Sequence, residues 1–364
     1  MKNITDTFLE SLLQRTGKKL STKHDKKLKN LLLDYLGVAC AGSVMLKENH
    51  IRFLEKMADE TSHSSLFGMN TKCSIQLAAL LNGMSAHAPE MDDGVRFGNY
   101  HPGASIISAL LAVAEKERVD AEHFFKGMMA GYEASVNLAI ALQPSHKKRG
   151  FHTTATCGVI GSAIGVAVML NYSIKELKTA LTLAVTSSSG LLEATRDHSN
   201  IKPFHTGKAA SNGITAAYLA VTGYQGGDDV LGGKEGFFHA MSDEELPAIF
   251  LDEDVYAIDM VYLKPYAACR HAHPAIEAAL LIRNSGIDNS RTIQAIDIDT
   301  YDIAIRGHNH KVANDTHSAK MSTPFSVAAA LVYGQADLNA FSKESLQNSE
   351  IKRLAGDRKS TRLN

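Results

Sequence analysis

Apolar residues recur at the spacing of an α-helix from Thr5 to about Tyr224. Asp120 is suited to an N-cap, and Ser173 with Glu176 forms a capping-box motif that opens a further helix. We therefore predict helices that include, in chain order, Phe8–Leu13, Leu28–Gly42, Ile75–Met84, Gly103–Lys116, Ala121–Gln143 and Cys157–Leu170. The first two-thirds of the chain is expected to be helical throughout.

The segment Cys157–Leu170 is almost wholly apolar and built from small residues. Gly158, Gly161 and Gly165 leave room for neighbouring backbones to approach closely. A bilayer-spanning helix takes about 20 residues, so this shorter segment is expected to be a buried core helix. We expect no apolar run of the chain to reach membrane-spanning length.

The pattern changes in the last third of the chain. Pro274 suits the first turn of an apolar helix, and Phe325–Tyr333 has the pattern of another. Between them, Ile293–Tyr301 and Ile303–Ile305 alternate as strands do. We therefore predict a mostly α protein with a large all-helical domain at 1–253, a smaller α+β domain at 254–355, and a frayed or foreign polar tail at 356–364.

The composition is that of an ordinary globular protein. The chain has 364 residues, 45% apolar and 21% charged, which leaves room for two domains. A formal net charge of −1, with no basic stripe, argues against a nucleic-acid or membrane-surface partner. The four cysteines are far apart, which favours a reducing compartment and argues against zinc knuckles or iron–sulfur clusters. Without a signal-peptide region, the protein is expected to be cytoplasmic.

Four segments carry chemically active side chains between the apolar helices: His87–Gly103, Gly150–Gly158, Arg196–Ser211 and Lys264–Pro274. Because Pro203 disfavours helical backbone at the residue before it, Arg196–Ser211 is predicted to be a cationic loop that leads into a helix near Gly207. Loops held between packed helices often carry binding and catalytic groups. Each segment alone also fits a solvated connector or a helix cap, and only their combination favours a site.

The first of these segments places three carboxylates, Glu90, Asp92 and Asp93, between His87 and His101. Paired acids and a histidine suit proton transfer, since one group must donate while another accepts. The helix that starts after His101 would also offer N–H groups to an anion. An acidic surface turn is the alternative interpretation.

His271 and His273 could ligate a metal if a third ligand were close. The candidates for that ligand are His308, His310 and His317. We favour an anion site at the start of the helix that follows His273, and assign no metal ligand.

The order of these motifs resembles the MmgE/PrpD family, which includes 2-methylcitrate dehydratase and cis-aconitate decarboxylase. The matching stretches are Glu90–Gly94 with His101–Gly103, Gly150–Thr154, Lys202–Lys208 and Lys264–His273. The resemblance covers almost everything to about Leu338. It implies a large helical domain with a smaller α+β lid domain, an active site between them that needs no cofactor, and usually a homodimer. Relatives continue beyond this chain's end, so the second domain is expected to be truncated.

The resemblance and the charges of these segments together indicate ten site residues. The expected catalytic residues are His101, His152, Lys202, His273 and Asp93. The expected substrate-binding residues are Glu90, Asp92, His205, Lys208 and Arg270. Gly94 stands where many relatives carry threonine, and Phe325 where some carry a catalytic tyrosine.

The resemblance implies a lyase that acts on a small di- or tricarboxylate. Removing a proton next to a carboxylate gives a high-energy anion, whose charge Lys202, Lys208 and Arg270 could offset. Dehydration, decarboxylation and epimerisation all pass through similar carbanion-like states, and we favour dehydration of the 2-methylcitrate type. The alternatives are a metal-dependent hydrolase, an inactive family member, and a helical interaction protein without catalysis.

Overall fold

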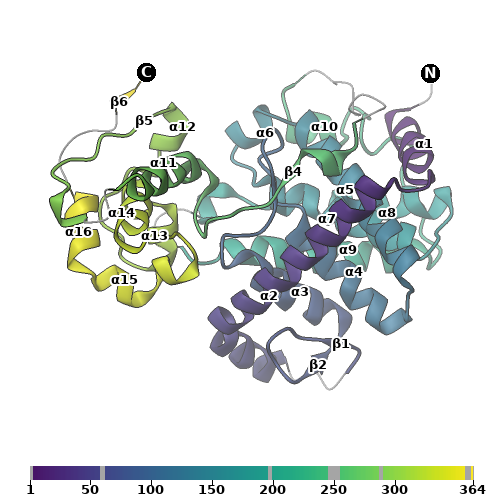
Figure 1. Ribbon diagram of the computed structural model, residues 1–364. Helices are drawn as coiled ribbons and strands as arrows, with labels where there is room; N and C mark the ends of the chain where they lie inside the picture. The colour runs from purple at the N-terminus through teal and green to yellow at the C-terminus, as the bar shows by residue number, and fades with distance from the viewer. Residues whose placement is uncertain are drawn as a thin grey trace. The chain divides into compact units, whose positions relative to one another are not determined.

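The structure is a computed structural model that describes residues 3–57, 62–195, 199–244, 255–286, 290–356 and 362–363. Contacts divide the chain into two compact units. The first consists of Met1–Ala88 and Asp92–Leu263, and the second of Pro89–Met91 and Lys264–Asn364. The described residues are mostly helical, as predicted (Figure 1). The predicted boundary after residue 253 lies outside the described residues.

The first unit is built almost entirely of helices, and each helix predicted there is present. Its α-helices are α1 (Ile4–Thr16), α2 (Thr22–Met57), α3 (Ile75–His87), α4 (Gly103–Glu117), α5 (Ala121–Ala141), α6 (Ser145–Lys148), α7 (Thr153–Met169), α8 (Ile174–Thr186), α9 (Lys202–Ala220) and α10 (Phe237–Met241). Two short 3-10 helices, η1 (Leu192–Thr195) and η2 (Ala257–Met260), join them. Its strands form two antiparallel pairs, β1 (Ser64–Ser65) with β2 (Lys72–Cys73) and β3 (Gly94–Val95) with β4 (Val261–Tyr262).

Two of these helices begin with the caps that were predicted. The Asp120 carboxylate accepts a hydrogen bond from the His123 N–H group at 2.9 Å, which caps α5. Ser173 and Glu176 form a complete capping box at the start of α8. Local sequence therefore sets these helix starts, because each cap satisfies backbone N–H groups that the helix itself leaves unpaired.

Helix α7 is buried along its whole length, as its small apolar residues predicted. A Cβ atom at Gly161 would lie 2.7 Å from Ser135 Oγ on α5. A Cβ atom at Gly127 would lie 2.6 Å from the carbonyl oxygen of Gly165. Only glycine permits this approach of α5 and α7, and the close packing holds the first turn of α7, capped by His152, in the interior.

Helix α9 begins at Lys202, so the prediction that Lys202 and Pro203 lie in a loop is wrong. Pro203 occupies the first turn, where a helix makes no use of the missing N–H group. Gly207 lies inside the helix, and a Cβ atom there would lie 2.1 Å from the carbonyl oxygen of Leu80 on α3. The polar residues of this segment therefore stand on a rigid helix, while residues 196–198 lie outside the described part of the chain.

Helix α2 is long and apolar enough to cross a membrane, judged by length and composition. The expectation that no run reaches membrane-spanning length is therefore wrong for this helix. The core helices of globular proteins can meet the same criterion, and Leu28, Leu31 and Tyr35 of α2 pack in the core of the first unit. Tyr35 also shares a hydrogen bond of 2.6 Å with Ser108 of α4.

The second unit has its own apolar core around α14 (Thr323–Tyr333), which packs against neighbouring helices of the same unit (Figure 1). The other α-helices are α11 (His273–Asn284), α12 (Asp302–Ile305), α13 (Thr316–Met321), α15 (Lys343–Gln347) and α16 (Ser349–Gly356). The 3-10 helices are η3 (Arg270–Ala272), η4 (Ser290–Thr292) and η5 (Leu338–Phe341). Pro274 lies in the first turn of α11, as predicted.

The strands predicted in this unit are mostly absent. Of Ile293–Tyr301, only β5 (Asp299–Thr300) is a strand, and it pairs in parallel with β6 (Arg362–Leu363). The segment Ile303–Ile305 belongs to α12. Alternating isoleucines need only one buried face, and Ile293, Ile296 and Ile298 find it against the helical core without a sheet. Apart from β6, the tail predicted at 356–364 lies outside the described residues beyond Gly356.

Candidate active site

In the first unit, the segment between α3 and α4 brings two histidines to one carboxylate. His87 donates a hydrogen bond from Nδ1 to Asp92 Oδ2 at 2.6 Å, and both side chains are buried. His101 Nδ1 lies 3.8 Å from the same oxygen, and the centroids of the two imidazole rings are 5.2 Å apart. His87 Nε2 is buried and has no hydrogen-bond partner among the described residues.

The backbone decides which nitrogen of His101 carries the proton. His101 Nδ1 lies 2.6 Å from the carbonyl oxygen of Asp93, which can only accept, so Nδ1 carries the hydrogen. In the neutral ring Nε2 is then the basic nitrogen. The side chain of His101 is 18% exposed, whereas that of His87 is fully buried. The ring of His101 is therefore partly open to solvent.

Asp93 is a buried carboxyl that holds its proton unusually well. Burial raises its pKa from 3.8 to about 7, although hydrogen bonds from Tyr132 and the Gly103 N–H group oppose the shift. The Tyr132 hydroxyl donates to Oδ2 at 2.7 Å, and the Gly103 N–H group donates to Oδ1 at 2.9 Å. At neutral pH the carboxyl is thus divided between its acid and its carboxylate forms.

A second pair of histidines joins α7 to α9. The Nδ1 atoms of His152 and His205 are 2.7 Å apart, and one of them donates a hydrogen bond to the other. Burial is the main cause that lowers the pKa of both rings, to about 4 for His205 and well below 6.5 for His152. Lys202, one turn before His205 on α9, is the next largest cause for His152. Both rings are therefore neutral near pH 7.

The two histidine pairs belong to one region of the first unit. After burial, the groups that lower the pKa of His152 are, in order, Lys202, His205, His87 and His101. The backbone N–H group of His101 also donates a hydrogen bond to Thr154 Oγ1 on α7, at 3.2 Å. His101, His152 and Lys202, three of the expected catalytic residues, therefore belong to one region of the first unit. Lys208 lies two turns into α9 and donates to the carbonyl oxygen and hydroxyl of Ser189.

The second unit gathers a different set of charges. Glu90 is in a left-handed backbone conformation, with φ of 60°, and is buried. Lys264 Nζ donates to the Glu90 carbonyl oxygen at 3.1 Å and lies 3.6 Å from its carboxylate. Lys320 donates to the Pro89 carbonyl oxygen at 3.1 Å. Hydrogen bonds from two buried ammonium groups thus hold the strained backbone at Glu90 in place.

Lys320 was not among the predicted site residues. Its side chain is buried, and burial lowers its pKa to about 8, with Glu90 opposing the shift. The lysine lies between Ala319 and Met321 in the short, mostly polar helix α13, so the sequence carried no clear signal of its burial. His87 was noted in the sequence but was not assigned a role.

His273 and Arg270 also lie in the second unit, where Arg270 is exposed and His273 is buried. His273 donates from Nε2 to the Ala268 carbonyl oxygen at 3.1 Å, and burial lowers its pKa to about 4. Its ring packs edge-on against Tyr266, with centroids 5.1 Å apart. The ring is therefore neutral and fixed in orientation.

The metal-ligand hypothesis fails for His273. The structure brings His271 close to His308 and Cys269, while His273 binds a backbone carbonyl instead. His310 lies 2.9 Å from the carbonyl oxygen of Ser318 and is not in that group.

The structure also places Gly94 and Phe325, the two positions expected from the sequence to differ from the family pattern. Gly94 lies in β3, and a Cβ atom there would lie 2.5 Å from the Tyr262 hydroxyl, so a threonine would not fit without a shift. Phe325 is buried in the core of the second unit. Neither residue supplies a hydroxyl group.

Comparison with known proteins identifies relatives over nearly the whole chain. Residues 13–249 match the MmgE/PrpD N-terminal domain, and residues 266–357 match the MmgE/PrpD C-terminal domain. Cis-aconitate decarboxylase of Mus musculus is 23% identical over 369 residues, which cover 97% of this chain and 75% of the mouse protein. The Homo sapiens enzyme is 23% identical over 368 residues, which cover 97% and 76%. The cis-aconitate decarboxylase-like protein oryM of Aspergillus oryzae is 25% identical over 358 residues, which cover 90% and 73%.

Proposed function

This chain belongs to the MmgE/PrpD family, and from that premise we propose that it is a lyase that decarboxylates a small unsaturated tricarboxylate of the cis-aconitate class. The similar proteins named above are decarboxylases or resemble one, which favours this reaction over the dehydration preferred from the sequence. The observation that carries the proposal is the grouping of His101, His152 and Lys202 in the first unit.

Decarboxylation of such an acid needs a cation and a proton donor. When the carbon–carbon bond to the departing carboxylate breaks, its electron pair moves through the double bond toward a remaining carboxylate. The ammonium group of Lys202, at the N-terminal end of α9, would stabilise that charge together with the helix N–H groups. Carbon dioxide leaves, and the carbon at the far end of the allylic system takes up one proton.

His101 is the residue that we assign to that proton transfer. Its Nε2 would take a proton from solvent, to which the ring is partly open, and pass it to carbon. The Asp92 carboxylate beside the ring would stabilise the imidazolium form. The buried pair of His152 and His205 stays neutral, so it can position the substrate by hydrogen bonding without adding charge.

Dehydration is the second candidate, and Asp93 favours it. A departing hydroxyl group needs an acid, and a carboxyl with a pKa of about 7 still holds a proton at neutral pH. The two reactions differ in their products, since one releases carbon dioxide and the other water.

The test is a panel of cis-aconitate, citrate and 2-methylcitrate, with carbon dioxide and the organic product both measured. We expect carbon dioxide and a dicarboxylate from cis-aconitate, and loss of that activity in Lys202→Met. Lys29→Met, an exposed lysine of α2, is the matched control and should keep full activity. Release of water from 2-methylcitrate without carbon dioxide would replace the proposal by dehydration. Equal turnover in Lys202→Met and the unchanged protein would overturn the assigned site.

A further inference from the structure

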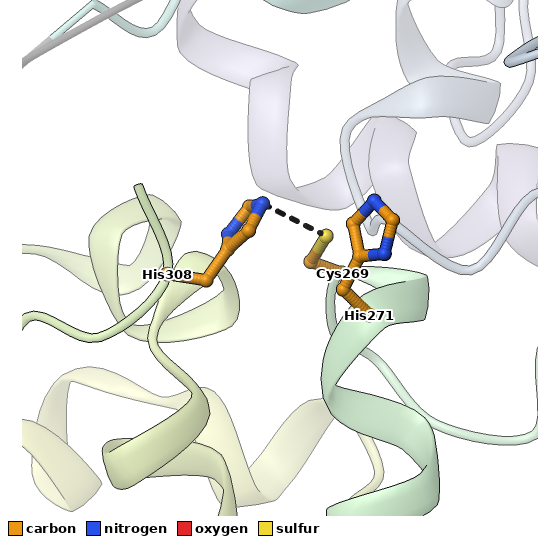
Figure 2. A group of neighbouring side chains, drawn as sticks. All are labelled: Cys269, His271 and His308. Atoms are coloured by element: carbon orange, nitrogen blue, oxygen red, sulfur yellow. Dashed lines mark hydrogen bonds between the residues drawn. The ribbon is translucent and has the colours of Figure 1, made fainter. Parts of the chain in front are cut away.

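Three potential metal ligands meet in the second unit, apart from the histidines and carboxylates of the first. Figure 2 shows Cys269, His271 and His308 directed toward a common space. One ligand atom of each residue lies within 4.8 Å of the others, and all three side chains are partly buried. Cys269 directly precedes η3, His271 lies within it, and His308 follows α12. The group therefore joins two neighbouring residues of one segment to a histidine 37 residues after His271.

One pair already has nearly the separation that a metal requires. Cys269 Sγ lies 3.7 Å from His308 Nε2 (Figure 2). A tetrahedral zinc ion, at about 2.3 Å from sulfur and about 2.0 Å from nitrogen, sets its ligand atoms roughly 3.5 Å apart. The nitrogen of His271, within 4.8 Å, could reach the same separation by a small rotation of its side chain.

The Nδ1 atom of each imidazole ring also has a hydrogen-bond partner, as is usual for histidines that bind a metal. His308 Nδ1 lies 2.9 Å from the carbonyl oxygen of Met321, so it carries the hydrogen and Nε2 is left as the basic nitrogen facing the sulfur. His271 Nδ1 lies 2.8 Å from the Tyr301 hydroxyl. Histidines that bind metals are oriented in this way by a carbonyl or similar group on the other nitrogen.

We propose that Cys269, His271 and His308 bind a divalent transition metal of the zinc class. One thiolate and two imidazoles suit zinc or cobalt rather than magnesium or calcium, which prefer oxygen ligands. Binding releases the thiol proton of Cys269 to solvent and forms one metal–sulfur and two metal–nitrogen bonds. The fourth position is open to water or an added ligand, and the ion ties η3 to the turn after α12.

The direct test is titration of chelator-treated protein with cobalt(II). We expect one equivalent to bind with the absorption of a thiolate-to-cobalt charge transfer, and zinc to displace it. Loss of a ligand in Cys269→Ser or His308→Ala should weaken binding by at least about 100-fold, more than the loss of an orienting group. The matched controls are Cys40→Ser, an exposed cysteine, and His310→Gln, and both should bind as the unchanged protein does. Absence of the thiolate band, or an unchanged affinity in Cys269→Ser, would overturn the proposal.

A second measurement uses the protein without substitution. Zinc should slow alkylation of Cys269 by iodoacetamide, read by mass spectrometry, and leave the rate at the exposed Cys40 unchanged. A chelator should restore the rate at Cys269. An equal rate at Cys269 with and without zinc would contradict the site. Both readouts are independent of any catalytic activity, so they stand or fall separately from the proposed reaction.

Discussion

Two buried groups of polar residues, one in each unit, differ in the partners that surround them. In the first unit, burial keeps the imidazoles of His152 and His205 neutral and leaves Asp93 partly protonated. In the second unit, Lys264 Nζ lies 3.6 Å from the Glu90 carboxylate, and both side chains are buried. The first arrangement favours the uncharged forms of its groups, and the second places an ammonium group next to a carboxylate.

The difference follows from which partners the fold supplies. A buried group without an opposite charge loses its own charge, because a low-dielectric interior disfavours the ion. His152 faces Lys202 and further imidazoles, which add no negative charge. Lys264 faces a carboxylate, which offsets the desolvation. The comparison predicts that substitution of His101 in the first unit mainly changes reactivity, and that substitution of Glu90 in the second mainly changes stability.

The largest expected effect is on turnover in the first unit. His101→Gln keeps a hydrogen-bond donor for the Asp93 carbonyl but cannot carry a proton to carbon, so kcat/KM should fall by about 10²–10⁴-fold with little change in stability. The assay is carbon dioxide release from cis-aconitate. His123→Gln, a substitution at the start of α5, is the control. A variant within a few-fold of the unchanged protein would remove His101 from the reaction.

The next effect is on the stability of the second unit. Glu90→Gln leaves Lys264 and Lys320 buried without the neighbouring carboxylate, so the free energy of unfolding should fall by about 3 kcal/mol in urea denaturation. Adding Lys264→Met should recover part of that loss, because one unpaired ammonium group is then removed. If the double variant is no more stable than Glu90→Gln alone, Glu90 and Lys264 are not energetically coupled.

A smaller effect should appear only in acid. Because the folded pKa of His205 is about 4 and the unfolded value is 6.5, unfolding takes up a proton between these values, and stability falls as pH drops from 6.5 to about 4. His205→Gln should remove up to about 2 kcal/mol of that pH dependence. The measurement is the unfolding free energy of both proteins across this range. Parallel pH profiles would show that the pKa of His205 is the same in the folded and unfolded states.

The smallest expected effect is a loss of stability at the start of α8, and it serves as a reference for the other predictions. Ser173→Ala removes the capping box of α8 on the surface, so the free energy of unfolding should fall by about 1 kcal/mol. Thermal unfolding would measure it, and turnover should not change. A loss of activity comparable to that of His101→Gln would show that activity reports general stability rather than the site.

The sequence predicted local features of the structure better than features that depend on residues far apart along the chain. The helices, the cap at Asp120 and the buried α7 depend on neighbours within a few residues, so their residues predicted them. The strand expected over Ile293–Tyr301 was wrong because the alternating pattern reports one buried face and not a sheet partner. The start of α9 at Lys202 was missed because packing against α3 favours helix where proline alone indicated a loop.

By itself, the sequence determined the helical pattern, the helix caps and the motifs that indicate the family, since each is written in consecutive or periodic residues. Only the tertiary structure decided which side chains meet: His87 with Asp92, Tyr132 with Asp93, and Cys269 with His308. It also raised the pKa of Asp93, because a pKa depends on burial and on partners that lie far apart along the chain.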